Sequence, residues 1–192
     1  MTRQHLSKPA LRRIFLERRA QIPPDIRKIS ADKACELFFE HIKVPAGAIV
    51  AGYWPIRAEL DDLPILLELT RLKRRCALPH VAGEEVPLVF RAWHETTPLV
   101  PGMYGIQEPA VGASLKPDII LVPMAAFDVK GHRLGYGAGF YDRTLKAIRP
   151  LLAIGLAYEE QLCGSLPVEE NDVRMDMIIT DRNVYRFGDT TL

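Results

Sequence analysis

Short runs of apolar residues recur along the 192-residue chain and are separated by segments with helical periodicity. Within each run the apolar residues are largely continuous, which is typical of strands buried on both faces of a parallel sheet. We therefore predict an α/β fold with a mostly parallel sheet that helices cover on both faces. The predicted strands are residues 48–54, 75–79, 88–93, 119–122, 151–156, 177–180 and 184–187.

Helices are predicted between these strands, because capping residues and prolines mark their ends. Residues 94–116 hold several prolines and glycines and are expected to form one long loop. No repeat or linker divides the chain, so residues 1–192 are expected to form a single domain. The first helix is predicted from Ser7, with Pro9 in its first turn, to Pro23-Pro24; the second begins near Ser30; the third is capped by Asp61 or Asp62; the fourth runs from about Gly139 to Arg149.

The charges of the chain are balanced in number but unevenly placed. There are 25 Lys and Arg against 24 Asp and Glu, a formal net charge of +1. This balance gives no general attraction to nucleic acids or membranes, so neither is an expected partner. Residues 1–33 nevertheless carry nine basic side chains against three acids. On the first predicted helix Lys8, Arg12 and Arg19 fall within about 40° of one another and form a basic stripe.

Cysteine usage and hydropathy indicate the compartment. Cys35, Cys76 and Cys163 lie far apart and have no C-x-x-C spacing. An odd, scattered set argues against a disulfide framework and against a zinc site, and favours free thiols in a reducing cytosol. No apolar run approaches the length that spans a bilayer, and the basic N-terminus lacks the apolar core of a signal peptide. We therefore expect a cytoplasmic protein.

Residues 131–142 are the strongest functional signal in the sequence. Gly135, Gly137 and Gly139 alternate with other residues, Arg133 precedes them and Asp142 follows them. Alternating glycines let a ligand approach the main-chain N–H groups, arginine suits phosphate or carboxylate, and aspartate can bind Mg²⁺. The segment follows a predicted strand, where α/β sheets bind ligands. It fits neither a Walker A loop nor the dinucleotide fingerprint, and a tight loop that merely packs closely is the alternative.

The residues in and around this glycine segment resemble the signature of the 5-formyltetrahydrofolate cyclo-ligase family. Each matching piece is short, but five pieces in the right order are specific. The pieces are Lys8, Leu11 and Arg12; Gly52 to Ile56 with Glu59; Gly105-Ile106 with Glu108-Pro109; Val122 to Asp128 with Gly131 to Arg143; and Glu160-Gln161, Pro167, Asp172-Val173, Asp176 and Thr180-Asp181.

The resemblance implies a fold and a reaction. The fold would be a single-domain, three-layer α/β/α Rossmann-like sandwich, and the protein would act as a monomer. The reaction would be ATP- and Mg²⁺-dependent ring closure of 5-formyltetrahydrofolate to 5,10-methenyltetrahydrofolate, with release of ADP and phosphate. In the family's proposed mechanism the formyl oxygen attacks the γ-phosphate of ATP, and N10 then displaces phosphate.

The resemblance also implies roles for individual residues. Arg133 and Tyr136 would be catalytic, and Asp142 and Asp172 would bind Mg²⁺. Folate would contact Trp54, Glu59, Tyr136, Gly137, Ala138, Gly139 and Phe140. ATP would contact Lys8, Arg12, Arg133, Leu134, Gly135, Tyr136, Gly137, Ala138, Gly139, Phe140 and Tyr141.

Several of these residues have a structural alternative. Lys8 and Arg12 could be a solvated helix face, and Trp54 could be a core residue. Asp142 could cap a helix or pair with Arg143, and Asp172 could form a local turn. The remaining alternatives are an N-terminal helix position for Glu59, favoured by the helix dipole, and an exposed loop position for His132.

Two residues depart from the family pattern, and two other functions stay open. Ala138 stands where relatives often have Gly or Lys, and Phe140 stands where Tyr is common, so affinities could differ. A non-catalytic module that binds nucleotide or folate for regulation is the main rival. A sugar-phosphate or CoA-processing enzyme on a similar sheet is supported by fold analogy alone.

Overall fold

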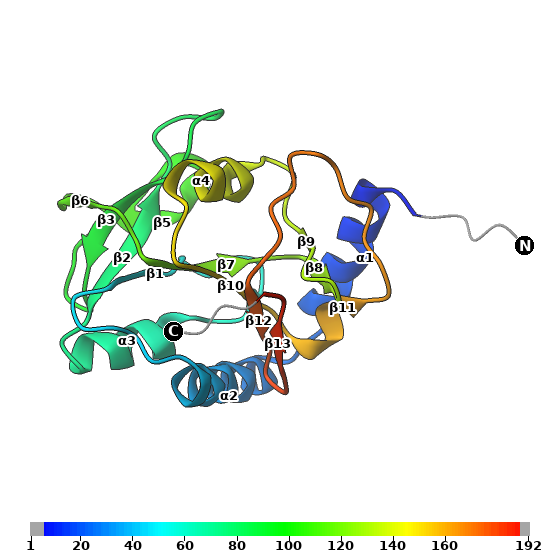
Figure 1. Ribbon diagram of the computed structural model, residues 1–192, viewed down its shortest axis with the longest axis horizontal. Coiled ribbons are helices and arrows are strands. Elements are labelled where there is room, and N and C mark those ends of the chain that lie inside the picture. The colour runs from blue at the N-terminus through cyan, green and yellow to red at the C-terminus, as the bar shows by residue number, and fades with distance from the viewer. Residues whose placement is uncertain (1–5, 189–192) are drawn as a thin grey trace, which may run out of the picture.

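A computed structural model describes residues 6–188 (Figure 1). Its helices are α1 (Lys8–Ala20), α2 (Pro24–His41), α3 (Leu63–Arg71) and α4 (Phe140–Ile148), with 3-10 turns η1 (Met103–Gly105) and η2 (Glu159–Gln161). Its strands are β1 (Ile49–Ala51), β2 (Arg75–His80), β3 (Val89–Trp93), β4 (Leu99–Pro101), β5 (Gln107–Pro109), β6 (Ser114–Leu115), β7 (Ile119–Pro123), β8 (Ala126–Asp128), β9 (Arg133–Leu134), β10 (Leu152–Leu156), β11 (Leu162–Cys163), β12 (Met177–Ile179) and β13 (Val184–Arg186). Across the described residues, none of these helices is both long and apolar enough to cross a membrane.

The central sheet has eight strands in the order β13-β12-β10-β7-β1-β2-β3-β6. The five strands from β12 to β2 are mutually parallel, and antiparallel strands occupy both sides of them. The parallel strands β7 and β10 are buried almost throughout, which explains their continuous apolar sequence. The predicted α/β class with a mostly parallel sheet is confirmed.

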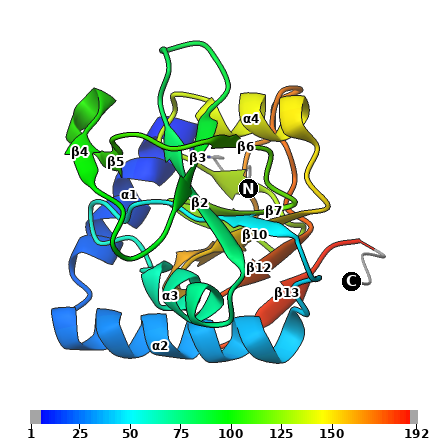
Figure 2. The ribbon, with the colours of Figure 1, turned by 90° about the vertical axis from the view of Figure 1, so that its left-hand side faces the viewer.

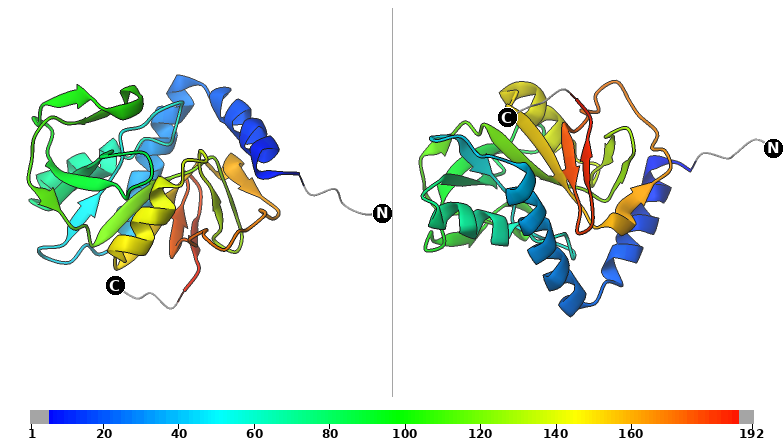
Figure 3. Two further views of the ribbon diagram at one scale, coloured as in Figure 1. Left: turned by 90° about the horizontal axis from the view of Figure 1, so that it is seen from above. Right: turned by 60° about the horizontal axis from the view of Figure 1, so that its bottom comes forward.

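Helices cover the two faces of this sheet, which makes three layers (Figures 1 and 2). Phe38 of α2 and Leu66 of α3 pack with Leu121 and Ile154 in one core cluster. On the opposite face, Leu145 of α4 packs with Ile120. Helix α1 stands apart from both layers, beside the small sheet β11-β8-β9 (Figure 3), so its basic stripe approaches the segment that follows β9.

Two predicted boundaries were wrong. The second helix begins at Pro24 rather than near Ser30, because proline is tolerated in the first turn of a helix, and Ser30 lies buried inside α2. Residues 94–116 are not one long loop, because they contain β4, η1, β5 and β6. The short strands β4 and β5 pair over only three residues, which is too little to give a recognisable periodicity.

Gly155 of β10 is the glycine at which a stability prediction is sharpest. A Cβ atom there would lie 2.2 Å from Cε of Met124 and 2.9 Å from Cγ1 of Ile178. We expect Gly155→Ala to lower the free energy of unfolding by about 2 kcal/mol through overpacking. Urea denaturation measures this. Gly164→Ala is the control, because a Cβ at Gly164 meets nothing within 4 Å; equal stability of the two variants would contradict the prediction.

Candidate active site

The glycine segment, residues 133–139, begins with β9 of the β8–β9 hairpin and leads into α4. The amide of Ala125 donates to the carbonyl of Leu134 at 2.7 Å, which holds the segment at the end of β7. Gly137 and Gly139 have φ angles of 104° and 71°, a region that favours glycine. Gly135 needs no such angle, but a Cβ there would meet only open space. The segment thus combines a backbone requirement at Gly137 and Gly139 with an uncovered surface at Gly135.

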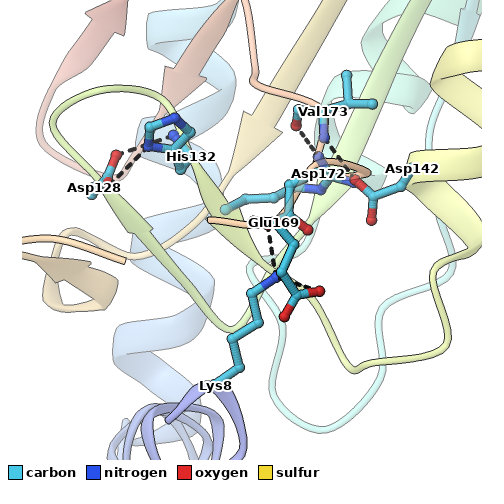
Figure 4. Close-up of polar contacts among 8 residues, drawn as sticks. Lys8, Asp128, His132, Asp142, Glu169, Asp172 and Val173 are labelled. Carbon is cyan, nitrogen blue, oxygen red and sulfur yellow. Dashed lines mark hydrogen bonds and ion pairs between the residues drawn. The ribbon is translucent and has the colours of Figure 1, made fainter. Parts of the chain in front are cut away.

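Two basic residues of α1 reach this segment, as the stripe predicts. Nε of Arg12 donates to the carbonyl of Gly135 at 2.7 Å, and its guanidinium lies 3.4 Å from where a Cβ of Gly137 would stand. Nζ of Lys8 lies 2.7 Å from Oδ2 of Asp172 and 3.3 Å from Oε2 of Glu169 (Figure 4). The basic side chains are therefore not a freely solvated face but face the glycine segment and the 169–172 loop.

Lys8 and Asp172 shift each other's protonation equilibrium. Burial by itself lowers the pKa of Lys8, but the hydrogen bonds and charges of Asp172 and Glu169 outweigh it and raise that pKa. For Asp172 burial raises the pKa, and the bond from Lys8 with that from the Glu169 amide outweighs it, so the pKa is lowered. Both groups are charged at neutral pH. Asp172 also makes a local turn with Glu169, which is the structural alternative considered from the sequence.

Asp142 lies in the first turn of α4, where Arg133 is its partner. Nη2 of Arg133 donates to Oδ1 of Asp142 at 2.7 Å, and the amide of Val173 donates to the same oxygen at 2.9 Å (Figure 4). The Arg133 side chain is only 4% exposed, and its Nη1 donates to the carbonyl of Val173. Arg143, the partner considered from sequence, donates instead to the carbonyls of Glu84 and Ala138.

Asp142 and Asp172 are thereby brought together through Val173, which follows Asp172 in the chain. Within residues 6–188, the hydrogen bonds to Asp142 all go to Oδ1 and those to Asp172 all go to Oδ2, so one oxygen of each remains for a ligand. No group of three or more His, Cys, Asp or Glu that could hold a metal occurs in this part of the chain. Two carboxylates fit Mg²⁺ that arrives with phosphate oxygens, because Mg²⁺ keeps few protein ligands.

Glu59 is 6% exposed and lies before α3 rather than in its first turn. Its Oε2 accepts from the amide of Ile56 at 2.8 Å. Burial raises the pKa of this carboxyl, which the Ile56 amide, a hydrogen bond with Tyr136 and the charges of Arg19 and Arg57 only partly offset.

A cavity of about 570 Å³ adjoins this carboxyl, and its lining includes Arg27, Pro55, Arg57 and Glu59. The cavity lies between the N-terminal part of α2 and the segment before α3. Trp54, next to that segment, is partly buried against the main core cluster. A ligand that enters here would meet three acids, Asp32, Glu59 and Asp61, and three basic side chains, Arg27, Lys28 and Arg57.

Tyr136 connects the glycine segment to the surroundings of Glu59. It belongs to the glycine segment, its hydroxyl accepts from Nη2 of Arg19, and the charge of the Glu59 carboxylate acts on it. Burial, then the charge of Glu59, raise the pKa of Tyr136 well above its ordinary value. The tyrosine is therefore a neutral hydrogen-bonding group at physiological pH.

Arg19 was predicted to lie in the basic stripe, but no role was predicted for it. His132 was predicted to be exposed. Arg19 is 2% exposed, at the meeting point of α1, Tyr136 and the segment before α3. The expectation for His132 was wrong, because its side chain is only 24% exposed and Nδ1 lies 3.1 Å from Oδ2 of Asp128 (Figure 4). The shared helix face of Lys8, Arg12 and Arg19 was the available signal for Arg19.

Comparisons with known proteins identify the family of this chain. The model of the 5-formyltetrahydrofolate cyclo-ligase family matches residues 4–181. A 5-formyltetrahydrofolate cyclo-ligase of Mycolicibacterium smegmatis is 33% identical over 189 residues, which cover 92% of this chain and 94% of the relative. One from Escherichia coli K12 is 30% identical over 182 residues, or 89% and 98% of the two chains.

A solved structure with a similar fold supports the same family. The NMR structure of 5,10-methenyltetrahydrofolate synthetase from Aquifex aeolicus superimposes with a TM-score of 0.84 at 32% identity, and the match covers 96% of this chain and 95% of that one. The resemblance stated from the sequence is confirmed over the whole fold. The chain belongs to the 5-formyltetrahydrofolate cyclo-ligase family, a family of ligases.

Proposed function

We propose that this protein catalyses the ATP-dependent cyclisation of 5-formyltetrahydrofolate to 5,10-methenyltetrahydrofolate, with release of ADP and phosphate. The observation that carries the proposal is the junction at Tyr136. A glycine segment flanked by Arg12 and by a pair of carboxylates, suited to a Mg²⁺-bound triphosphate, meets there a buried glutamate suited to a pterin. Membership of the family supports the same reaction.

In the proposed chemistry the formyl oxygen attacks the γ-phosphorus, and the bond from phosphorus to the ADP oxygen breaks. The N5 lone pair forms a C=N⁺ bond, which gives an iminium phosphate. N10 then attacks the formyl carbon, the carbon–oxygen bond breaks, phosphate leaves, and N10 loses its proton. Phosphorylation turns a poor leaving oxygen into a good one, and cations with main-chain N–H donors stabilise the charge of the transferring phosphoryl group.

On the nucleotide side, we assign the triphosphate to Lys8, Arg12 and the segment from Arg133 to Tyr141. Arg133 would act chiefly by fixing Asp142, because its guanidinium is enclosed by Asp142 and the Val173 carbonyl. Asp142 and Asp172 would hold Mg²⁺, which when bound would neutralise phosphate charge. For Lys8 to contact phosphate, the triphosphate would compete with Asp172 and Glu169 for its ammonium group.

On the folate side, Glu59 would accept two hydrogen bonds from the aminopyrimidinone edge of the pterin. Trp54 would form an apolar wall, and residues 136–140 would contact both substrates. Phe140 lacks the hydroxyl that Tyr would bring and lies 6.1 Å, centroid to centroid, from the ring of Tyr104. Ala138 lies at an exposed position of the same segment, where a Lys would have added a cation.

A single assay separates this proposal from a non-catalytic binding module. Purified protein is mixed with 5-formyltetrahydrofolate and MgATP, and the absorbance of the methenyl product and the release of ADP are followed. We expect both to require folate and ATP together. Binding of either ligand without product would instead support the regulatory module. The accompanying proposal is that residues 1–192 form one domain and a cytoplasmic monomer, and size-exclusion chromatography with light scattering tests the monomeric state.

Lys8→Ala is expected to raise the KM for ATP about tenfold or more, and to leave the KM for 5-formyltetrahydrofolate within about twofold. The reason is the loss of a charge-assisted bond to phosphate, which contributes about 1.5 kcal/mol or more. Steady-state kinetics with each substrate varied in turn measures this. Arg13→Ala, an exposed position on the same helix, is the control. Equal rises of both KM values would mean that the basic stripe is only structural.

A further inference from the structure

Arg19 differs from Lys8 and Arg12, the other members of the basic stripe, because its side chain is enclosed. It is 2% exposed and among the largest fully buried side chains of the described residues. A buried guanidinium destabilises a fold unless its N–H groups have acceptors and its charge is compensated. The hydrogen-bond acceptors of Arg19 therefore show which segments of the protein its buried side chain holds together.

These acceptors come from three separate segments. Nη1 donates to the carbonyl of Met124, just beyond β7, at 3.0 Å. Nε and Nη2 donate to the carbonyl of Arg57 at 3.2 Å and 2.9 Å. Nη2 also donates to the hydroxyl of Tyr136. One side chain of α1 thus joins the end of a central strand, the segment before α3 and the glycine segment.

The segment that Arg19 holds has an unusual backbone. Arg57 and Ala58 have φ angles of 49° and 58°, a region that non-glycine residues seldom adopt and that surrounding structure must stabilise. Two N–H groups of Arg19 converge on the carbonyl of Arg57, immediately before Ala58 and Glu59. The conformation of residues 57–58 determines where the Glu59 carboxylate lies.

The same contact orients Tyr136. Its ring lies close to two guanidinium groups, with the centroid 5.6 Å from Cζ of Arg19 and 5.5 Å from Cζ of Arg57. Both positive charges also act on the Glu59 carboxylate, which compensates them. Arg19 therefore contacts or faces the nucleotide-side tyrosine and the folate-side acid at once.

We propose that Arg19 is a positioning residue, which holds the glycine segment at Tyr136 and the 57–59 segment with Glu59 in one fixed arrangement. This inference rests on the proposed cyclo-ligase function. Transfer requires the formyl oxygen and the γ-phosphorus to approach about 3–3.5 Å, so a small displacement of either segment slows the reaction. Lysine is not equivalent at this position, because a single ammonium group lacks the fork that reaches three acceptors.

The test compares Arg19→Lys with Arg13→Lys, a substitution at an exposed position of the same helix. We expect Arg19→Lys to raise the KM for 5-formyltetrahydrofolate about tenfold, the loss of one or two charge-assisted bonds. Its kcat should also fall, while the KM for ATP stays within about twofold because Lys8 and Arg12 are intact. Arg13→Lys should match the wild type. Unchanged kinetics of Arg19→Lys, or equal changes of both KM values, would overturn the proposal.

Tyr136→Phe keeps the inference testable if Arg19→Lys does not fold. It removes the same contact but leaves Arg19 its two carbonyl acceptors. We expect a comparable rise in the KM for folate. Where Arg19→Lys folds, the double variant should show little further rise. An unchanged KM in Tyr136→Phe, or fully additive effects in the double variant, would overturn the inference. Absence of product from the wild-type protein would instead reject the proposed function, so the two failures are distinguishable.

Discussion

Asp142→Asn is expected to reduce kcat about 100-fold or more and to raise the Mg²⁺ concentration needed for half-maximal activity. The asparagine can still accept a hydrogen bond at Oδ1, but it no longer offers a charged oxygen to a cation that offsets phosphate charge, an effect of several kcal/mol. Initial rates over a Mg²⁺ series at saturating ATP and folate measure both quantities. Asp25→Asn, at the exposed start of α2, should behave as wild type.

The same substitution is expected to destabilise the fold, because it leaves the 4%-exposed Arg133 side chain without a charged partner. A lost bond to a charged group costs about 2 kcal/mol, which urea denaturation resolves. Arg133→Lys separates the two effects, since it weakens the same pair but leaves the Asp142 carboxylate in place. It should lower stability and raise the Mg²⁺ requirement less than Asp142→Asn does, because Arg133 only positions the carboxylate. If Asp142→Asn keeps the wild-type Mg²⁺ dependence, Asp142 does not bind the metal.

Glu59→Gln is expected to raise the KM for 5-formyltetrahydrofolate about 30-fold, because a charged acceptor of two hydrogen bonds is replaced by a neutral one, at about 2 kcal/mol. The KM for ATP should change little. Folate binding without ATP, measured by calorimetry, provides a second readout that does not depend on turnover. Glu17→Gln, at an exposed position of α1, is the control. A folate affinity equal to that of the wild type would exclude Glu59 from the pterin site.

The raised pKa of Glu59 predicts a pH dependence in the wild-type protein that the glutamine variant should lack. The carboxylate is charged only above that pKa, so folate affinity should fall as the pH drops through it, starting above the ordinary value of 4.5. Because folding raises this pKa, the protonated acid favours the folded state, and ionisation removes stability as the pH rises through the folded-state pKa. The glutamine variant should therefore be as stable as the wild type or more so, and the Glu59-dependent fall in folate affinity should be absent.

The fold was predictable where burial gives a local signal. Residues 119–122 and 151–156 are continuous apolar runs because β7 and β10 lie inside a sheet covered on both faces. The limits of α1 followed from the residues at its ends, but the start of α2 did not, because Pro24 both separates two helices and begins one. The strands within 94–116 were missed because two- and three-residue strands have no measurable period.

The part of the candidate site that is contiguous in the sequence was predictable from residue types and spacing, but the contacts between distant residues were not. The glycine segment and its flanking charges are contiguous, so composition and spacing alone indicated a cradle for a charged ligand. Lys8 and Asp172 are 164 positions apart, and Arg19 and Tyr136 are 117 apart. Residues this far apart have no fixed spacing in the sequence, so a sequence pattern cannot show that they are in contact.

The sequence by itself determined the α/β class, the glycine segment and the family. These properties depend on burial periodicity, glycine sterics and short ordered motifs, which act within a few residues of one another. The tertiary structure alone decided that Arg133 pairs with Asp142, that Lys8 faces Asp172, and that Arg19 is enclosed between Tyr136 and the carbonyl of Arg57. Ion pairs of this kind depend on strand order and on where α1 packs, because a charge finds its partner by proximity in space rather than in sequence.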